Sequence, residues 1–344
     1  MAMKASWKKI VALLVAAFAL SLGVAACGGS DDSSSDSGSS GEMKDATLVL
    51  DFIPGAVHAG IYEAKSKGYY EDNGINLKII EPTSTADTLK LIDAGKADFG
   101  IADGIDMASQ IEEGREAKAI MAILQRPPGG LITLEEDGIA TPADLAGKTV
   151  GVTGVPSDNA ILDTIMADAG SNSDEADVVT IGFNGVQSLE AGKVQAFTGF
   201  IPADGVQVEA DGYKTKSFPL DENGGPSYPG LVAFSTETMI ADDPDLMKGF
   251  VEASIKGYQD ALADPEAALT SLEDQTQGLD PELQKQVFDA YIPYFGESDT
   301  YGQFKKEALE SLSTFLVDSD LASEPIAPDR YATNEFSGGD SLGE

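Results

Sequence analysis

Short runs of β-branched and apolar residues alternate along this chain with segments that carry apolar side chains at helical spacing. This alternation is typical of βα units built around mainly parallel sheets. The pattern predicts strands at 47–51, 77–80, 98–101, 119–124, 131–134, 148–152, 178–181 and 194–198. From residue 244 it becomes helical, with helices expected over 244–263, 265–275, 281–294 and 303–318. We therefore expect an α/β fold with a helical C-terminal part.

One turn between a helix and a strand occurs twice. Segment 92–100 (IDAGKADFG) ends a helix at Gly95 and begins a strand after a lysine, and segment 189–197 (LEAGKVQAF) repeats this at Gly192. The two copies indicate two similarly built α/β lobes, and a chance likeness of two such turns is the alternative. Strand ends and helix N-termini of two such lobes would face a cleft between them.

The first 26 residues have the form of a secretory signal, with lysines, an apolar run at 10–22 and small residues before Cys27. The run is too short to span a membrane, which needs about 20 residues. Its ending resembles the bacterial lipobox, which implies cleavage before Cys27 and acylation of the Cys27 thiol; an ordinary signal with an incidental cysteine is the alternative. Because Cys27 is the only cysteine, disulfides and thiolate metal sites are not expected. Residues 28–42 contain only Gly, Ser, Asp and Glu and predict a flexible tether.

The chain is strongly acidic, with a formal net charge of −36. Nucleic acid and anionic lipid would be repelled, so neither is expected as a partner. The three arginines, Arg115, Arg126 and Arg330, are few for a protein that holds sulfonate or phosphate. Helix N-termini could replace them, so the argument against an anionic ligand stays open.

Segment 51–62 (DFIPGAVHAGIY) holds the densest cluster of candidate binding residues. A strand ends there, a Pro-Gly turn follows and a helix begins near His58, which places Asp51, Phe52, His58 and Tyr62 at a strand-to-helix junction where open α/β sheets bind ligands. His58 is the only histidine, so a metal site is not expected. The alternatives are that His58 caps the helix and that Phe52 belongs to the core.

Other candidates follow from their positions at the ends of predicted strands or the starts of helices. Each has a structural alternative, as a helix cap, a turn residue or a packed side chain. They are Asp103, Gln125, Asp158, Asn184, Phe200 and Asp204.

The run from 51 to 64, with KGYY at 67–70, resembles the opening of substrate-binding proteins of the nitrate, taurine and thiamine-pyrimidine uptake family. The spacing of His58 and Tyr62 is most similar to the branch that captures thiamine pyrimidine precursors. Further matches are AGKADFG at 94–100, PADLAGK at 142–148 and YPGLV at 228–232, and the likeness extends over about 46–235.

This resemblance implies a two-lobed periplasmic-binding-protein fold of type II-like form, in which each lobe is a mainly parallel sheet flanked by helices. Its expected divisions are a signal at 1–26, a tether at 27–42, lobe 1 at 43–127 plus 235–336, lobe 2 at 128–234 and a disordered tail at 337–344. The implied protein is a monomer, anchored by lipid on Cys27 at the outer face of the cytoplasmic membrane. It would capture a small heteroaromatic solute by lobe closure and deliver it to an ABC permease with its cytoplasmic ATPase.

The chain departs from the family pattern at two positions. Phe52 stands where tryptophan is usual, and Gly55 stands where asparagine is usual. The family's eukaryotic relatives make the pyrimidine with a cysteine-rich iron-binding segment that this chain lacks, so we expect no enzyme, no catalytic residue and no cofactor. Three alternatives remain: the same fold binding a sulfonate, nitrate or riboflavin-like solute, a lipid-anchored hydrolase that uses Asp51 and His58, and an adhesion module.

Overall fold

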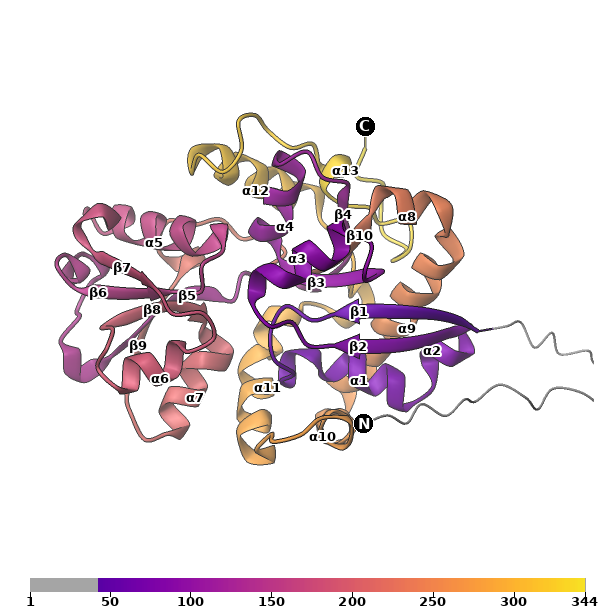
Figure 1. The fold of residues 1–344 in the computed structure, drawn as a ribbon, viewed down its shortest axis with the longest axis horizontal. Coiled ribbons are helices and arrows are strands. Elements are labelled where there is room, and N and C mark those ends of the chain that lie inside the picture. The colour runs from indigo at the N-terminus through magenta and orange to yellow at the C-terminus, as the bar shows by residue number, and fades with distance from the viewer. Residues whose placement is uncertain (1–42, 344) are drawn as a thin grey trace, which may run out of the picture. The chain divides into compact units, whose positions relative to one another are not determined.

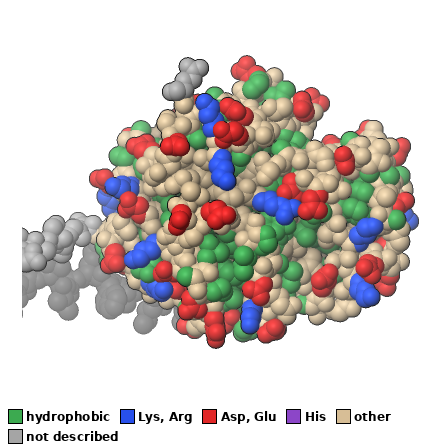
Figure 2. Space-filling view, turned by 180° about the vertical axis from the view of Figure 1, so that it is seen from behind, with side chains coloured by type: hydrophobic (Ala, Val, Ile, Leu, Met, Phe, Trp, Pro, Cys, Tyr) green, Lys and Arg blue, Asp and Glu red, His purple; other side chains and the backbone are tan. Residues whose placement is uncertain are grey.

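The computed structural model describes residues 43–343, and these fall within one compact unit. The predicted signal at 1–26, the lipidated Cys27 and the tether lie outside the described residues. No helix within 43–343 is both long and apolar enough to span a bilayer. Acidic side chains are spread over the face of the molecule seen in Figure 2, as the composition leads one to expect.

The first sheet has five strands in the order β2-β1-β3-β10-β4. The pairs β1–β2 and β1–β3 are parallel, whereas β10 runs antiparallel to both of its neighbours. Its strands are β1 (Lys44–Val49), β2 (Ile75–Ile80), β3 (Phe99–Asp103), β4 (Ala117–Leu124) and β10 (Leu231–Thr236).

The second sheet repeats this plan in the order β7-β6-β8-β5-β9. Here β6 pairs in parallel with β7 and β8, and β5 is the antiparallel strand. Its strands are β5 (Gly129–Leu134), β6 (Thr149–Val152), β7 (Asp177–Thr180), β8 (Ala196–Phe200) and β9 (Thr215–Pro219). Each sheet is therefore mixed, with two parallel and two antiparallel pairings, and the two sheets confirm the predicted two-lobed α/β fold.

Side chains of β1 alternate between the two faces of the first sheet because successive residues of a strand point to opposite sides. Leu48 and Leu50 belong to one buried cluster with α1 and α9, and Val49 belongs to another with α3 and α4. Figure 1 shows these helices on opposite faces of the sheet. The helices around this sheet are α1 (Ala59–Ser66), α2 (Tyr69–Asp72), α3 (Thr85–Asp93), α4 (Gly104–Glu112), α8 (Glu237–Asp242), α9 (Pro244–Ala263), α10 (Pro265–Gln275), α11 (Pro281–Phe295), α12 (Lys306–Asp318) and α13 (Pro328–Tyr331).

The second sheet carries α5 (Pro156–Asp168), α6 (Gly185–Glu190) and α7 (Val206–Ala210). A short 3₁₀ helix, η1 (Ala56–His58), precedes α1, and a π-helical turn, η5 (Ile201–Gly205), precedes α7. The chain passes from the first sheet to the second between β4 and β5 and returns just before β10. The expected boundary after residue 127 falls between β4 and β5, whereas the one after residue 234 falls inside β10 of the first sheet. The lobe boundaries stay a prediction.

The C-terminal segment differs from the disordered tail expected at 337–344. Leu342 is buried, and the Asn334 side chain donates from Nδ2 to the carbonyl oxygens of Phe304 and Asp340, both at 2.9 Å. Residues up to 343 therefore pack against the first lobe through one asparagine and one leucine, a pairing too short to give a periodic signal.

Candidate functional site

A cavity of about 390 Å³ lies between the carboxyl ends of the strands of the two sheets, and both sheets and α11 contribute to its lining. Parallel strands of each sheet end on the same edge, so the loops that follow them converge there. Of the ten residues expected to bind a ligand, seven line the cavity: Asp51, Phe52, His58, Asp103, Asp158, Phe200 and Asp204.

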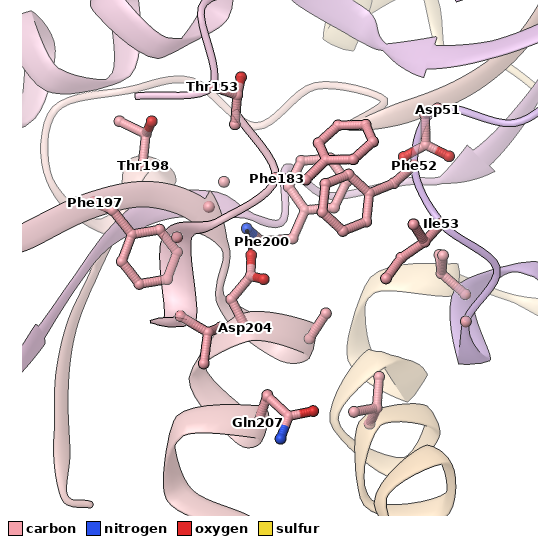
Figure 3. A pocket seen from close by; sticks show the side chains of 18 of the residues that line it. Asp51, Phe52, Ile53, Thr153, Phe183, Phe197, Thr198, Phe200, Asp204 and Gln207 are labelled. Carbon is pink, nitrogen blue, oxygen red and sulfur yellow. Dashed lines mark hydrogen bonds between the residues drawn. The ribbon is translucent and has the colours of Figure 1, made fainter. Parts of the chain in front are cut away.

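Two aromatic rings from different sheets meet at this cavity. Phe52 follows β1 and Phe183 follows β7, and their ring centroids lie 4.1 Å apart with an interplanar angle of 57°. Figure 3 shows both rings beside Phe200, with the Asp204 carboxylate below them. These rings supply flat apolar surfaces against which a planar heterocycle can stack.

The Asp51 and His58 side chains form a buried pair at the start of η1. His58 Nε2 lies 2.8 Å from Asp51 Oδ1, and the backbone N–H of Gly55 donates to His58 Nδ1 at 3.2 Å. Because that N–H can only donate, we assign the neutral tautomer with its proton on Nε2, directed to Asp51. Both ring nitrogens are thus occupied, whereas Asp51 Oδ2 makes no hydrogen bond to a described residue.

A second group of carboxyls joins the N-terminus of α4 to that of α5. Asp106 accepts hydrogen bonds from the backbone N–H and the hydroxyl of Ser157, both at 2.9 Å. Asp103 caps α4 by accepting from the Ile105 N–H at 2.7 Å. Burial raises the pKa of Asp106 to about 7, with Ser157 opposing the shift, and burial and the neighbouring Asp106 charge raise the pKa of Asp103 well above its usual range.

Asp158 caps the N-terminus of α5, although it also lines the cavity. Its Oδ2 accepts from the N–H groups of Gly154 and Val155 at 2.7 and 3.0 Å and from the Thr153 hydroxyl at 2.8 Å. Its Oδ1 accepts from the Thr198 hydroxyl. The capping alternative considered for Asp158 is therefore present in the structure, and both of its oxygens are used.

Asp204 lies in η5, the π-helical turn after β8. Its Oδ2 accepts from the Phe200 N–H at 2.8 Å, while Oδ1 makes no hydrogen bond within the described residues. Burial raises the pKa of Asp204 to about 6. A Cβ at Gly199 would come within 2.6 Å of Asp204 Oδ2, so only glycine at 199 leaves room for this carboxyl.

Three expected site residues lie outside the cavity lining. Tyr62 is buried in the core of the first lobe, because α1 turns its side chain away from the strand ends, and burial raises its pKa to about 12. Gln125 donates from Nε2 to the Gln303 carbonyl oxygen at 2.8 Å. Asn184 shapes its own turn by donating to the Ile181 carbonyl oxygen at 3.0 Å.

Sequence reasoning missed several lining residues. Phe183 directly precedes Asn184, and the choice between them depends on how the turn after β7 rotates, which no periodicity reveals. Gln284 and Tyr291 come from α11, whose helical pattern predicted only burial. No lysine or arginine is among the residues that line the cavity.

Comparisons with known proteins agree with this architecture. A family model described as NMT1/THI5 like matches residues 56–268. A formylaminopyrimidine-binding protein of Halalkalibacterium halodurans is 24% identical, over 85% of this chain and 90% of that protein. A 4-amino-5-hydroxymethyl-2-methylpyrimidine phosphate synthase of Legionella pneumophila is 28% identical, over 73% of this chain and 80% of that protein. The solved alkanesulfonate-binding protein SsuA of Xanthomonas axonopodis is similar in fold, with a TM-score of 0.66, 15% identity and coverage of 83% of this chain and 96% of that one.

Proposed function

The chain belongs to the NMT1/THI5-like family, and on that premise we propose that it is the extracytoplasmic solute-binding component of an ABC importer. Its ligand is a small heteroaromatic solute such as a thiamine pyrimidine precursor, captured by closure of the two lobes. One observation carries this proposal: the cavity between the sheets combines the rings of Phe52 and Phe183 with free carboxylate oxygens of Asp51 and Asp204.

The polar groups of the cavity favour a ligand that donates hydrogen bonds. Asp51 Oδ2 and Asp204 Oδ1 can each accept from an amino group or a protonated ring nitrogen. A flat ring with such groups at its edge would stack on Phe52 while its edge meets the carboxylates. Aminopyrimidines have this arrangement, and the formylaminopyrimidine-binding relative supports the same ligand class.

The same chemistry disfavours the sulfonate and nitrate alternatives. The cavity lining includes carboxyls and no lysine or arginine, so an anion would meet negative charge and no cationic side chain to balance its own. Arg126, the arginine nearest in sequence to the crossing into the second sheet, holds Asp221 and Glu222 instead. A riboflavin-like ligand, which is flat and uncharged in its ring system, remains the second candidate.

We propose binding without catalysis, although some relatives are named as pyrimidine synthases. A hydrolase of the kind considered above would need His58 to take a proton from a nucleophile. Here His58 Nδ1 accepts from the Gly55 N–H and Nε2 faces Asp51, so neither nitrogen is available to a substrate hydroxyl or water.

The experiment that tests the ligand class is a thermal-shift panel followed by isothermal titration calorimetry. The panel contains formylaminopyrimidine, hydroxymethylpyrimidine, riboflavin, taurine and nitrate. A selective rise of the unfolding temperature with the pyrimidines is expected, because a ligand that binds only the folded state stabilises it. A rise with taurine alone would contradict the proposal.

We also propose that Cys27 carries the lipid that holds the protein at the outer face of the cytoplasmic membrane, where a permease and its ATPase receive the solute. The motif before Cys27 supports this. In cell fractionation, the wild-type chain is expected with the membranes and Cys27→Ser in the soluble fraction. Membrane retention of Cys27→Ser after signal cleavage would contradict lipid anchoring through that thiol.

A further inference from the structure

Helix α11 contacts both halves of the cavity wall, since it packs against η1 beside the first sheet and against η5 and α7 beside the second. Gln284, Val287 and Tyr291 lie on one face of α11, spaced by three and four residues, and all three line the cavity. The two polar members of this face, Gln284 and Tyr291, have no part in the carboxyl clusters described above.

The Gln284 amide is held in one orientation. Its Oε1 accepts a hydrogen bond from the backbone N–H of Ala56 at 2.7 Å, and the side chain is buried. Because the Ala56 N–H can only donate, the oxygen must face it and the NH₂ group must point the other way. That NH₂ group has no hydrogen-bond partner in the part of the chain that the structure describes.

The Tyr291 phenol is in a similar position. Its side chain is only 1% exposed, and its hydroxyl makes no hydrogen bond to a residue within 43–343. Burial, followed by the charges of Asp204 and Asp51, raises its pKa well above the usual range, so the hydroxyl keeps its proton. The hydroxyl borders the cavity, so it can donate a hydrogen bond to a molecule bound there.

Most of the other side-chain donors around the cavity are already engaged, and the exception is the amide of Gln187, an exposed side chain on α6. His58 Nε2 faces Asp51, and the Thr153 and Thr198 hydroxyls donate to Asp158. The free acceptor oxygens of Asp51 and Asp204 and the two free donors on α11 therefore border the same cavity. A ligand that satisfies both sets must carry hydrogen-bond donors as well as an acceptor.

We propose that Gln284 and Tyr291 are specificity-determining residues that donate hydrogen bonds to an acceptor on the ligand, such as a formyl or amide oxygen or a ring nitrogen. This inference rests on the proposed solute-binding function and adds to it the second half of the recognition pattern. It predicts that the protein discriminates among aminopyrimidines by the acceptor on the substituent as well as by the amino group.

Two nearly isosteric substitutions test the inference in the full chain. Gln284→Glu keeps an oxygen for the Ala56 N–H and removes the NH₂ donor, and Tyr291→Phe removes only the hydroxyl. Gln286→Glu and Tyr294→Phe are matched controls, because both lie on α11 and neither lines the cavity. Calorimetry measures affinity for formylaminopyrimidine and for 4-amino-2,5-dimethylpyrimidine, which lacks the formyl oxygen.

Each test variant is expected to lose roughly tenfold in affinity for formylaminopyrimidine and clearly less for the dimethyl compound, as expected for one lost hydrogen bond. A merely structural role would weaken both compounds equally. The controls are expected to bind like the wild type.

The outcomes separate the inference from the proposed function. If the wild type binds the pyrimidines and both test variants keep its affinity or its selectivity, the inference is overturned and the proposed function stands. If the wild type instead binds riboflavin or taurine, the pyrimidine assignment fails, and the same four variants are measured with that compound. Unchanged affinity in Gln284→Glu and Tyr291→Phe then overturns the inference. A loss of affinity in these two variants and not in the controls supports it. If no probe binds, both are overturned.

Discussion

The backbone N–H of Gly55 donates to Nδ1 of His58 at 3.2 Å, while Nε2 of the same ring lies 2.8 Å from Oδ1 of Asp51. The imidazole therefore links the turn after β1 to a carboxylate at the cavity. We therefore propose that His58 is a positioning residue, which acts on a ligand through Asp51 rather than by direct contact.

Replacing His58 by alanine is expected to weaken ligand binding by about 1–3 kcal/mol, because Asp51 would lose the donor that orients it in a buried site. Calorimetry with formylaminopyrimidine measures the loss. Tyr62→Phe is the control, since Tyr62 lies outside the cavity lining and one helical turn away. Equal losses in the two variants would contradict a positioning role for His58.

Phe52→Ala is expected to cost about 1–3 kcal/mol of binding free energy, because it removes a stacking surface and its contact with Phe183. Tyr213→Ala removes an exposed aromatic ring of the second lobe that is not part of the cavity and serves as the control. Unchanged affinity in Phe52→Ala would place the ligand elsewhere.

The Asp204 carboxyl should make stability depend on pH. Its pKa in the folded protein is raised to about 6, so the folded state binds a proton more tightly than the unfolded chain does. The resulting stabilisation is complete below the ordinary carboxyl pKa of about 4 and is lost as the pH rises through about 6.

Asp204→Asn removes this titration and can still accept from the Phe200 N–H. Between pH 4 and pH 7, the free energy of unfolding of the wild type should fall relative to that of Asp204→Asn, by on the order of 2 kcal/mol. Urea unfolding at several pH values measures the difference. A difference that does not vary with pH would contradict the raised pKa.

Ser157→Ala tests the link between α4 and α5. The Ser157 hydroxyl donates to Asp106, whose pKa is raised to about 7 by burial, so the lost hydrogen bond should raise that pKa further. The carboxylate form loses more than the protonated form, so the destabilisation of about 1 kcal/mol should be larger at pH 8 than at pH 5.

The matched control is Ser109→Ala. Ser109 is also buried, but its hydroxyl donates to the Ile105 carbonyl oxygen within α4. Its effect on the urea midpoint should be the same at both pH values. If the effect of Ser157→Ala is equally independent of pH, Asp106 does not titrate in contact with Ser157.

The sequence pattern predicted helices and strands well where a single local rule determines where the element begins or ends. The helices expected at 244–263 and 265–275 match α9 and α10, because Asp-Pro pairs start both and cap their N-termini. The repeated glycine turn occurs before β3 and β8, which hold equivalent places in the two sheets, and Gly95 and Gly192 have φ values of 61° and 65°. β9 and β10 were not predicted, since a lone strand without βα alternation has only a weak signal.

What the sequence determined by itself was the alternation of elements, the doubled α/β plan and the segment 51–58 that reaches the cavity, because these depend on neighbours within a few residues. Only the tertiary structure decided which side chains meet. Phe183 rather than Asn184 faces Phe52, Tyr62 turns into the core, and α11 brings Gln284 and Tyr291 to the site. The physical reason is that a side chain's direction at a strand end, and the partner that uses its hydrogen bonds, depend on how separate elements pack.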